Sequence, residues 1–205
     1  MRRNHISRLF LGYLTASLFL AVGLLCAQQK VCPELDGLST EVELQFLKQG
    51  RATPDPTCVA RALYDISLAR GLSEHVFSDA VLTLLTYLDY RLPDQGTKYE
   101  RAVSSNRDPY PASSALFIVG KRAVPYIVEL IGKGQAASEV SIRNALDTLG
   151  AIYREDPPQA VRVLKSAADI NARDFQKAER LRKAARDVTF CHGSVRQACI
   201  DAFYE

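Results

Sequence analysis

Apolar residues follow a helical spacing most regularly between Tyr110 and Ala168, where they recur at steps of three and four. Side chains with these steps lie on one face of an α-helix, so the pattern predicts amphipathic helices with one buried face each. The two clearest stripes are Val124, Ile127, Val128 and Ile131, and Ile142, Ala145, Leu146, Leu149, Ile152 and Tyr153. The pattern therefore predicts an all-α fold in which helices pack against one another.

Residues that commonly start helices agree with this pattern. Ser138 and Asp156 can each accept a hydrogen bond from the first turn of a following helix. Pro125 falls in a first turn, where a missing N–H costs little. Near the beginning, Thr40 followed by Glu43 predicts a capping box, in which each side chain bonds the other residue's backbone N–H.

A last long helix is predicted from Asp174 to Val188. Its inward face is predicted to contain Phe175, Ala178, Leu181, Ala185 and Val188. Its outward face is predicted to contain Lys177, Arg180, Arg182, Lys183 and Arg186. A basic amphipathic helix can lie on an acidic membrane surface. The alternative is a solvated outer face, which the buried faces of the preceding helices favour.

Two helical hairpins in this region have related sequences. Ala115-Leu116 in the first aligns with Ala145-Leu146 in the second, 30 residues later, and Gly120 then stands opposite Gly150 at the predicted end of each first helix. The second helices align Ala123 with Ala160, 37 residues later. A period in this range with two helices per copy is typical of an α-solenoid.

The A-L-x-x-x-G ending of the first helices and the second helix AVPYIVELI resemble the HEAT-like repeat family. The resemblance covers residues of about 78–168, with Ser78–Tyr90 as a weaker third match. It implies a short α-solenoid of stacked helical hairpins that binds partners on its surface. The alternative is an irregular helical domain that contains two similar hairpins.

The first 27 residues have the layout of a secretory signal helix. A basic segment from Met1 to Arg8 precedes an uncharged apolar run, and cleavage after Ala27 is predicted. The sequence thus predicts a signal peptide over residues 1–27, a helical domain over 28–205, and export to the periplasm or the extracellular space. Two alternatives remain: residues 7–27 are retained as a membrane anchor, or Cys26 is lipid-modified.

Four cysteines follow the signal, an even number in a chain bound for an oxidising compartment. This predicts disulfides, and the most economical pairing joins Cys32 to Cys58 and Cys191 to Cys199, towards the two ends of the helical domain. The alternative is a zinc site built from Cys191, His192 and Cys199. It lacks a fourth ligand nearby, so no metal site is predicted.

The longest irregular stretch runs from Arg91 to Pro109. Loops of this length within a domain are often binding elements. Its cations and tyrosines form the predicted partner-contact set, which consists of Lys98, Tyr99, Arg101, Arg107 and Tyr110. These residues suit an acidic or carbohydrate partner, and a merely solvated loop is the alternative.

Charge and motifs restrict the function. Of 26 Lys and Arg residues, Arg2, Arg3 and Arg8 belong to the predicted signal, which leaves 23 cations against 23 Asp and Glu residues. Nucleic acid is therefore not an expected partner. A phosphate-binding glycine loop, a G-x-S-x-G elbow, an H-E-x-x-H pair and a C-x-x-C motif are all missing from the sequence, so neither a cofactor nor catalysis is predicted.

These observations together predict an exported protein-binding or scaffold module of the cell envelope. The first alternative is a secreted hydrolase that uses Cys191 and His192, which are adjacent in the sequence. The second is a structural protein that stays anchored in the membrane by its first helix.

Overall fold

The computed structural model describes Cys32, Leu35 and the ranges 37–49, 55–92, 109–134, 137–186, 191 and 195–204. The predicted signal peptide lies outside these residues. The chain divides into two units, Met1–Glu34 and Leu35–Glu205. Every regular element in the described part of the second unit is helical, which confirms the predicted all-α class.

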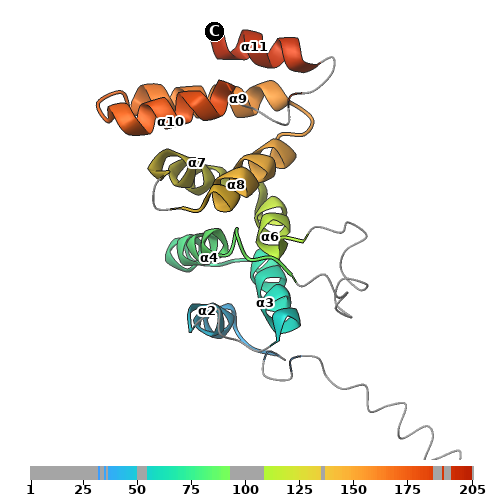
Figure 1. Cartoon of the computed structure of the whole chain (residues 1–205). Coiled ribbons are helices and arrows are strands. Elements are labelled where there is room, and N and C mark those ends of the chain that lie inside the picture. The colour runs from blue at the N-terminus through green and yellow to red at the C-terminus, as the bar shows by residue number, and fades with distance from the viewer. Residues whose placement is uncertain are drawn as a thin grey trace, which may run out of the picture. The chain divides into compact units, whose positions relative to one another are not determined.

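The helices of the second unit pack in two rows (Figure 1). In chain order they are α2 (Thr40–Lys48), α3 (Pro56–Leu68), α4 (Glu74–Thr86), α6 (Pro111–Val119), the 3-10 turn η2 (Gly120–Ala123), α7 (Val124–Lys133), α8 (Glu139–Ile152), α9 (Pro157–Ile170), α10 (Phe175–Arg186) and α11 (Arg196–Tyr204). Consecutive contacts join α2, α4, α7 and α10 in one row and α3, α6, α8, α9 and α11 in the other.

One apolar core runs between the rows. Almost every helix contributes a large side chain that is fully buried, and these are Leu47, Leu63, Leu84, Leu116, Ile127, Leu149, Leu164 and Leu181. Burying one such side chain contributes roughly 1.5–3 kcal/mol before conformational entropy is subtracted. The core is therefore shared along the described helices from α2 to α10.

The predicted helix starts are only partly correct. Ser138 Oγ accepts the N–H of Ser141 at 3.1 Å, as predicted, and α9 begins after Asp156, although that side chain forms no cap hydrogen bond. The capping box at Thr40 is wrong, because Ser39 precedes the helix and the Glu43 side chain is buried against its neighbours. A buried carboxyl faces the core and cannot also reach back to the helix start.

The two aligned glycines occupy different positions. Gly120 follows α6 with a φ of +73°, a conformation that favours glycine. Gly150 instead lies inside α8, which continues to Ile152. The prediction that Gly150 ends its helix is therefore wrong.

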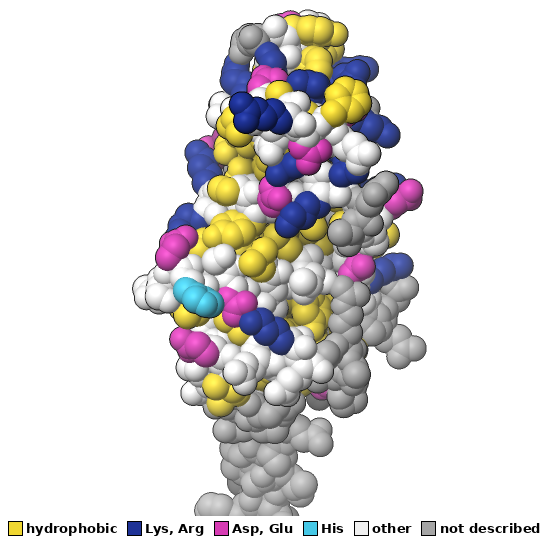
Figure 2. All heavy atoms as spheres, turned by 90° about the vertical axis from the view of Figure 1, so that its left-hand side faces the viewer, with side chains coloured by type: hydrophobic (Ala, Val, Ile, Leu, Met, Phe, Trp, Pro, Cys, Tyr) yellow, Lys and Arg dark blue, Asp and Glu magenta, His cyan; other side chains and the backbone are white. Residues whose placement is uncertain are grey.

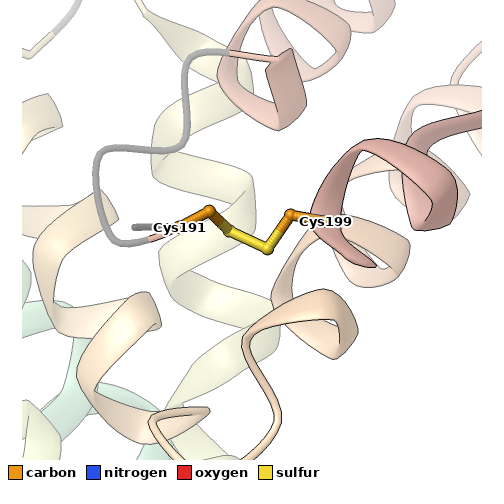
Figure 3. Close-up of a disulfide and its surroundings, with 2 residues drawn as sticks. All are labelled: Cys191 and Cys199. Carbon is orange, nitrogen blue, oxygen red and sulfur yellow. A yellow bond between two sulfur atoms is a disulfide. The ribbon is translucent and has the colours of Figure 1, made fainter. Parts of the chain in front are cut away.

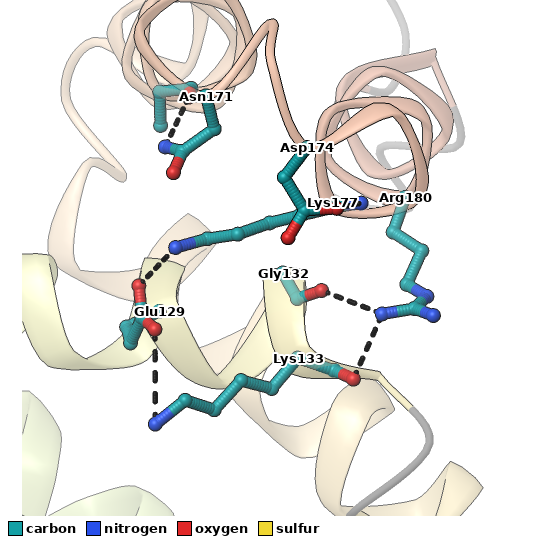
Figure 4. Close-up of polar contacts among 8 residues, drawn as sticks. Glu129, Gly132, Lys133, Asn171, Asp174, Lys177 and Arg180 are labelled. Carbon is teal, nitrogen blue, oxygen red and sulfur yellow. Dashed lines mark hydrogen bonds and ion pairs between the residues drawn. The ribbon is translucent and has the colours of Figure 1, made fainter.

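Helix α10 buries a different set of residues from the set that its apolar spacing predicts. Phe175 is 72% exposed rather than inward. Lys177 and Arg180 were expected in solvent, but both reach α7 (Figure 4). Lys177 Nζ donates to Glu129 Oε2 at 2.6 Å. Arg180 Nη1 donates to two carbonyl oxygens at the end of α7, those of Gly132 and Lys133, at 3.0 and 2.9 Å.

We call these contacts of Lys177 and Arg180 with α7 the α7–α10 clasp. Gly134, which follows α7, makes the clasp possible. Its φ is +57°, and a Cβ there would lie 2.5 Å from Cδ of Arg180. Glycine adopts this dihedral angle without strain, and a Cβ would also displace the flexible end of Arg180 from the clasp.

Both predicted disulfide pairs are present. Cys191 is bonded to Cys199, with 6.3 Å between their Cα atoms, and this bond ties the segment that follows α10 to α11 (Figure 3). Cys32 and Cys58 are likewise disulfide-bonded.

Gly134→Ala is expected to destabilise the protein by about 2–4 kcal/mol, because the added Cβ displaces Arg180 from its hydrogen bonds to α7, in addition to the cost of the positive φ. Gly71→Ala is the matched control, since Gly71 has a φ of +67° but no atom within 4 Å of an added Cβ. It should cost only about 1 kcal/mol. Urea unfolding measures both losses.

A double-mutant cycle isolates the clash. Arg180→Ala removes the side chain that the added Cβ would meet, so Gly134→Ala should cost less in that background than in the wild type. Equal losses for the two glycine variants, or strict additivity of Gly134→Ala and Arg180→Ala, would show that the close approach has no energetic consequence.

Candidate functional site

Tyr110 is the one member of the predicted contact set that lies among the described residues. Lys98, Tyr99, Arg101 and Arg107 lie outside them. Tyr110 is half-buried at the position preceding α6. Just before it, the carbonyl of Pro109 accepts a hydrogen bond of 2.8 Å from the N–H of Leu92. The two described ends of the predicted binding segment therefore lie side by side, next to Tyr110.

Tyr110 borders a groove between α6 and α8 with a volume of about 570 Å³. We call it the α6–α8 groove. Phe117, which is 46% exposed, contributes apolar surface to it. Helix α8 contributes charged side chains to the lining, namely Arg143, Asp147 and, just beyond the helix end, Arg154. An aromatic and arginine-rich lining is typical of protein-binding surfaces.

Polar groups form the inner wall of this groove. Asn144 is 7% exposed, and its Nδ2 donates to the carbonyl of Leu88 at 2.6 Å. Thr148 Oγ1 donates to the Asn144 carbonyl at 2.7 Å. Within the described part of the chain, the buried Ser113 Oγ has no hydrogen-bond partner. Buried hydroxyls are normally paired, so Ser113 Oγ is an exception beside the groove, although the atom itself is inaccessible to solvent.

The apolar stripe predicted to be the buried face of α8 is only partly buried. Ala145 and Leu149 are buried as predicted, but Ile142 and Leu146 remain partly exposed. These two line a second groove of about 650 Å³ between α7, α8 and α10, which we call the α8–α10 groove. The most buried face of α8 contains small polar residues as well as apolar ones, namely Ser141, Asn144 and Thr148. The three- and four-residue spacing of these polar residues is the sequence signal that could have identified this buried face.

A third, smaller groove of about 340 Å³ lies between α4 and α7. Leu82, Tyr126 and Leu130 give it an apolar lining. Figure 2 views the molecule from the side on which these two helices lie, and hydrophobic side chains gather there among charged ones. The rows of helices therefore leave several open apolar surfaces.

The cysteine proposed as a nucleophile is in a disulfide. Cys191 Sγ is bonded to Cys199 Sγ, and His192 lies outside the described residues. A thiolate is the nucleophilic form of cysteine, so thiol catalysis at this position would first require reduction of the bond.

Glu43 has the most strongly shifted carboxyl pKa among the described residues. Burial, followed by the negative charge of Asp65 on α3, raises its pKa from 4.5 to about 7, and Arg61 opposes the shift. Arg61 pairs with Asp65 at 3.3 Å and is therefore already partly neutralised. A carboxyl that titrates near neutrality has a pKa suited to proton transfer. Here it also makes stability depend on pH.

Glu43→Gln tests this dependence. The unfolded chain loses the Glu43 proton near pH 4.5 and the folded chain near pH 7, so wild-type stability contributed by this group falls as pH rises through that window. The glutamine variant should therefore gain about 1–3 kcal/mol over the wild type between pH 4.5 and pH 8. Urea unfolding at the two pH values measures the gain.

Glu41→Gln on the same helix is the control. Backbone and Ser39 hydrogen bonds lower the pKa of Glu41, so its removal should produce no gain with rising pH. Identical pH profiles for the wild type and Glu43→Gln would contradict the assignment of the shift to Glu43.

Comparisons with protein-family models, with curated proteins and with solved structures find no match to the chain. Among the described residues, no helix combines the length and apolar character needed to cross a membrane. The function must therefore be inferred from the grooves and from the chain's own residues.

Proposed function

We propose that this chain is an exported helical-repeat protein that binds another protein in the cell envelope or outside the cell. The observation that carries the proposal is the pair of open grooves on either side of α8. Each combines an apolar surface with charged or hydrogen-bonding groups, as protein interfaces do.

A HEAT-like arrangement is part of this proposal. Two rows of helices with a shared core are what such repeats require. The aligned alanines Ala115 and Ala145 are both fully buried, and their helices α6 and α8 contact each other. Small buried residues at equivalent positions let successive helices approach closely, which supports equivalent roles for these two helices.

Export is supported by the state of the cysteines. All four cysteines predicted to remain in the mature chain are disulfide-bonded. Disulfides persist in oxidising compartments and are rare in the cytosol. The basic and apolar opening of the chain, which fits a secretory signal, points in the same direction.

Of the two grooves, we assign partner binding first to the α6–α8 groove. It includes Tyr110 from the predicted contact set. Its volume of about 570 Å³ also suits a small molecule. The exposed Phe117 and the arginines at its border favour a protein partner, because aromatic residues and arginine are enriched in protein interfaces.

A photoreactive amino acid at Phe117 tests partner binding. In cells that export the protein, it should form one discrete adduct with a second protein upon irradiation, because the side chain is exposed in the groove. The same amino acid at Ile200 on α11 is the control, since Ile200 is 41% exposed but does not line this groove. Equal adducts at both positions, or none at Phe117, would contradict the proposal.

Export has an independent test in the thiol count. A mature chain that begins at Gln28 lacks Cys26, so denaturation without reductant should release no free thiol. Amino-terminal sequencing of the secreted protein should read Gln28 first. A chain that starts at Met1 and contains one titratable thiol would instead support the retained membrane anchor.

A further inference from the structure

The α8–α10 groove has an apolar floor. Ile131 of α7, Ile142 and Leu146 of α8, and Ala184 of α10 line it. Ile142 and Leu146 are one helical turn apart and both remain partly exposed. A row of this length matches apolar side chains spaced at i and i+3 or i+4 on another helix.

The border of this groove is basic. Arg143, Arg180 and Lys183 line it together with one carboxylate, Glu139. Arg180 is engaged in the α7–α10 clasp. Arg143 and Lys183 are exposed, and neither forms an ion pair or hydrogen bond with another described residue.

The other cations of α10 contrast with Lys183. Lys177 pairs with Glu129, Arg182 with Asp169, and Arg186 with Glu179. Among the described cations of this helix, Arg180 and Lys183 thus have no acidic partner, and both line the groove. Arg180 bonds carbonyl oxygens of α7, whereas Lys183 forms no ion pair with a described residue. The arrangement leaves positive charge uncompensated next to an apolar surface.

These features disfavour other occupants. A second copy of the chain would bring the same cations to the same surface, and like charges would repel. Nucleic acid binds to extended basic surfaces, whereas the predicted mature chain has equal numbers of basic and acidic residues. A lipid chain is best enclosed, and this groove lies open between three helices.

We propose that the α8–α10 groove binds an acidic amphipathic helix of another protein. Apolar side chains of that helix would pack on Ile142 and Leu146, and its Asp or Glu residues would pair with Arg143 and Lys183. The inference rests on the proposed protein-binding function and names the partner's chemistry at one groove.

A designed peptide tests the inference with the purified exported protein. The probe is a fluorescein-labelled helical peptide with leucine at i, i+3, i+4 and i+7 and glutamate at the positions flanking them. Anisotropy titration should show it binding at least tenfold more tightly than the same peptide with lysine for glutamate. Its affinity should fall several-fold between 50 mM and 500 mM NaCl, because exposed ion pairs are screened.

Lys183→Glu should weaken binding of the acidic peptide about three- to tenfold, as expected for reversal of one border charge. Arg173→Glu, at an exposed site in the α9–α10 turn, is the matched control and should leave the affinity unchanged. Leu146→Gln should weaken binding independently of salt, because it removes apolar floor. Circular dichroism verifies that each variant is folded.

Three outcomes overturn the inference: equal binding of acidic and basic peptides, an unchanged affinity for Lys183→Glu, or a self-associated chain that Lys183→Glu dissociates. Lys183-dependent binding to phosphatidylglycerol vesicles without peptide binding would also overturn it, in favour of a lipid surface. If the peptide does not bind but Phe117 still forms a discrete adduct, only the inference of an acidic helical partner is rejected. If Phe117 forms no adduct, the proposed protein-binding function is rejected.

Discussion

The contacts of α10 with α7 determine which cations of α10 remain exposed. Lys177 is 18% exposed and bonds Glu129, whose pKa is lowered chiefly by this hydrogen bond. Arg180 occupies the last carbonyls of α7, groups that a helix leaves unpaired at its end. Exposed ion pairs alone contribute little, but here a half-buried pair and a helix cap act on the same two helices. Gly134 leaves the space through which the arginine passes.

This clasp also separates the roles of the cations on α10. Lys177 and Arg180 contact α7 and hold the helix, and Arg180 also lines the groove. Lys183 lies further along and lines the groove without bonding α7. Because charged side chains on one side hold α10 against α7, a cation on the next turn can remain exposed while the helix stays packed on the core. Ala178, Leu181 and Ala185 maintain the apolar contact beneath. The structural and the proposed binding residues thus occupy adjacent turns of one helix.

Much of the fold could be predicted. The three- and four-residue spacing of apolar residues specifies helices, and an even number of cysteines predicts disulfides. The residues that define the grooves were not. Periodicity identifies an apolar stripe on α8 but does not say which neighbour covers it, so Ile142 and Leu146 looked like core residues. Lys177 was assigned to solvent because a long cation usually is, and only its partner Glu129, 48 positions away, places it otherwise. Such pairings depend on tertiary contacts that local sequence does not encode.

The polar face of α8 explains why two apolar residues are left outside the core. Asn144 reaches the carbonyl of Leu88, just after α4, so this hydrogen bond fixes the polar face of α8 towards that segment. The bond from Thr148 to the Asn144 carbonyl lies within α8 and satisfies the threonine hydroxyl. A helix has one rotation about its axis. With the polar face turned inwards, Ile142 and Leu146 necessarily lie to one side, at the α8–α10 groove. A leucine in place of Asn144 would bury more apolar surface but would leave the Leu88 carbonyl unpaired and release this constraint. The buried amide therefore sets the orientation that exposes the proposed binding surface.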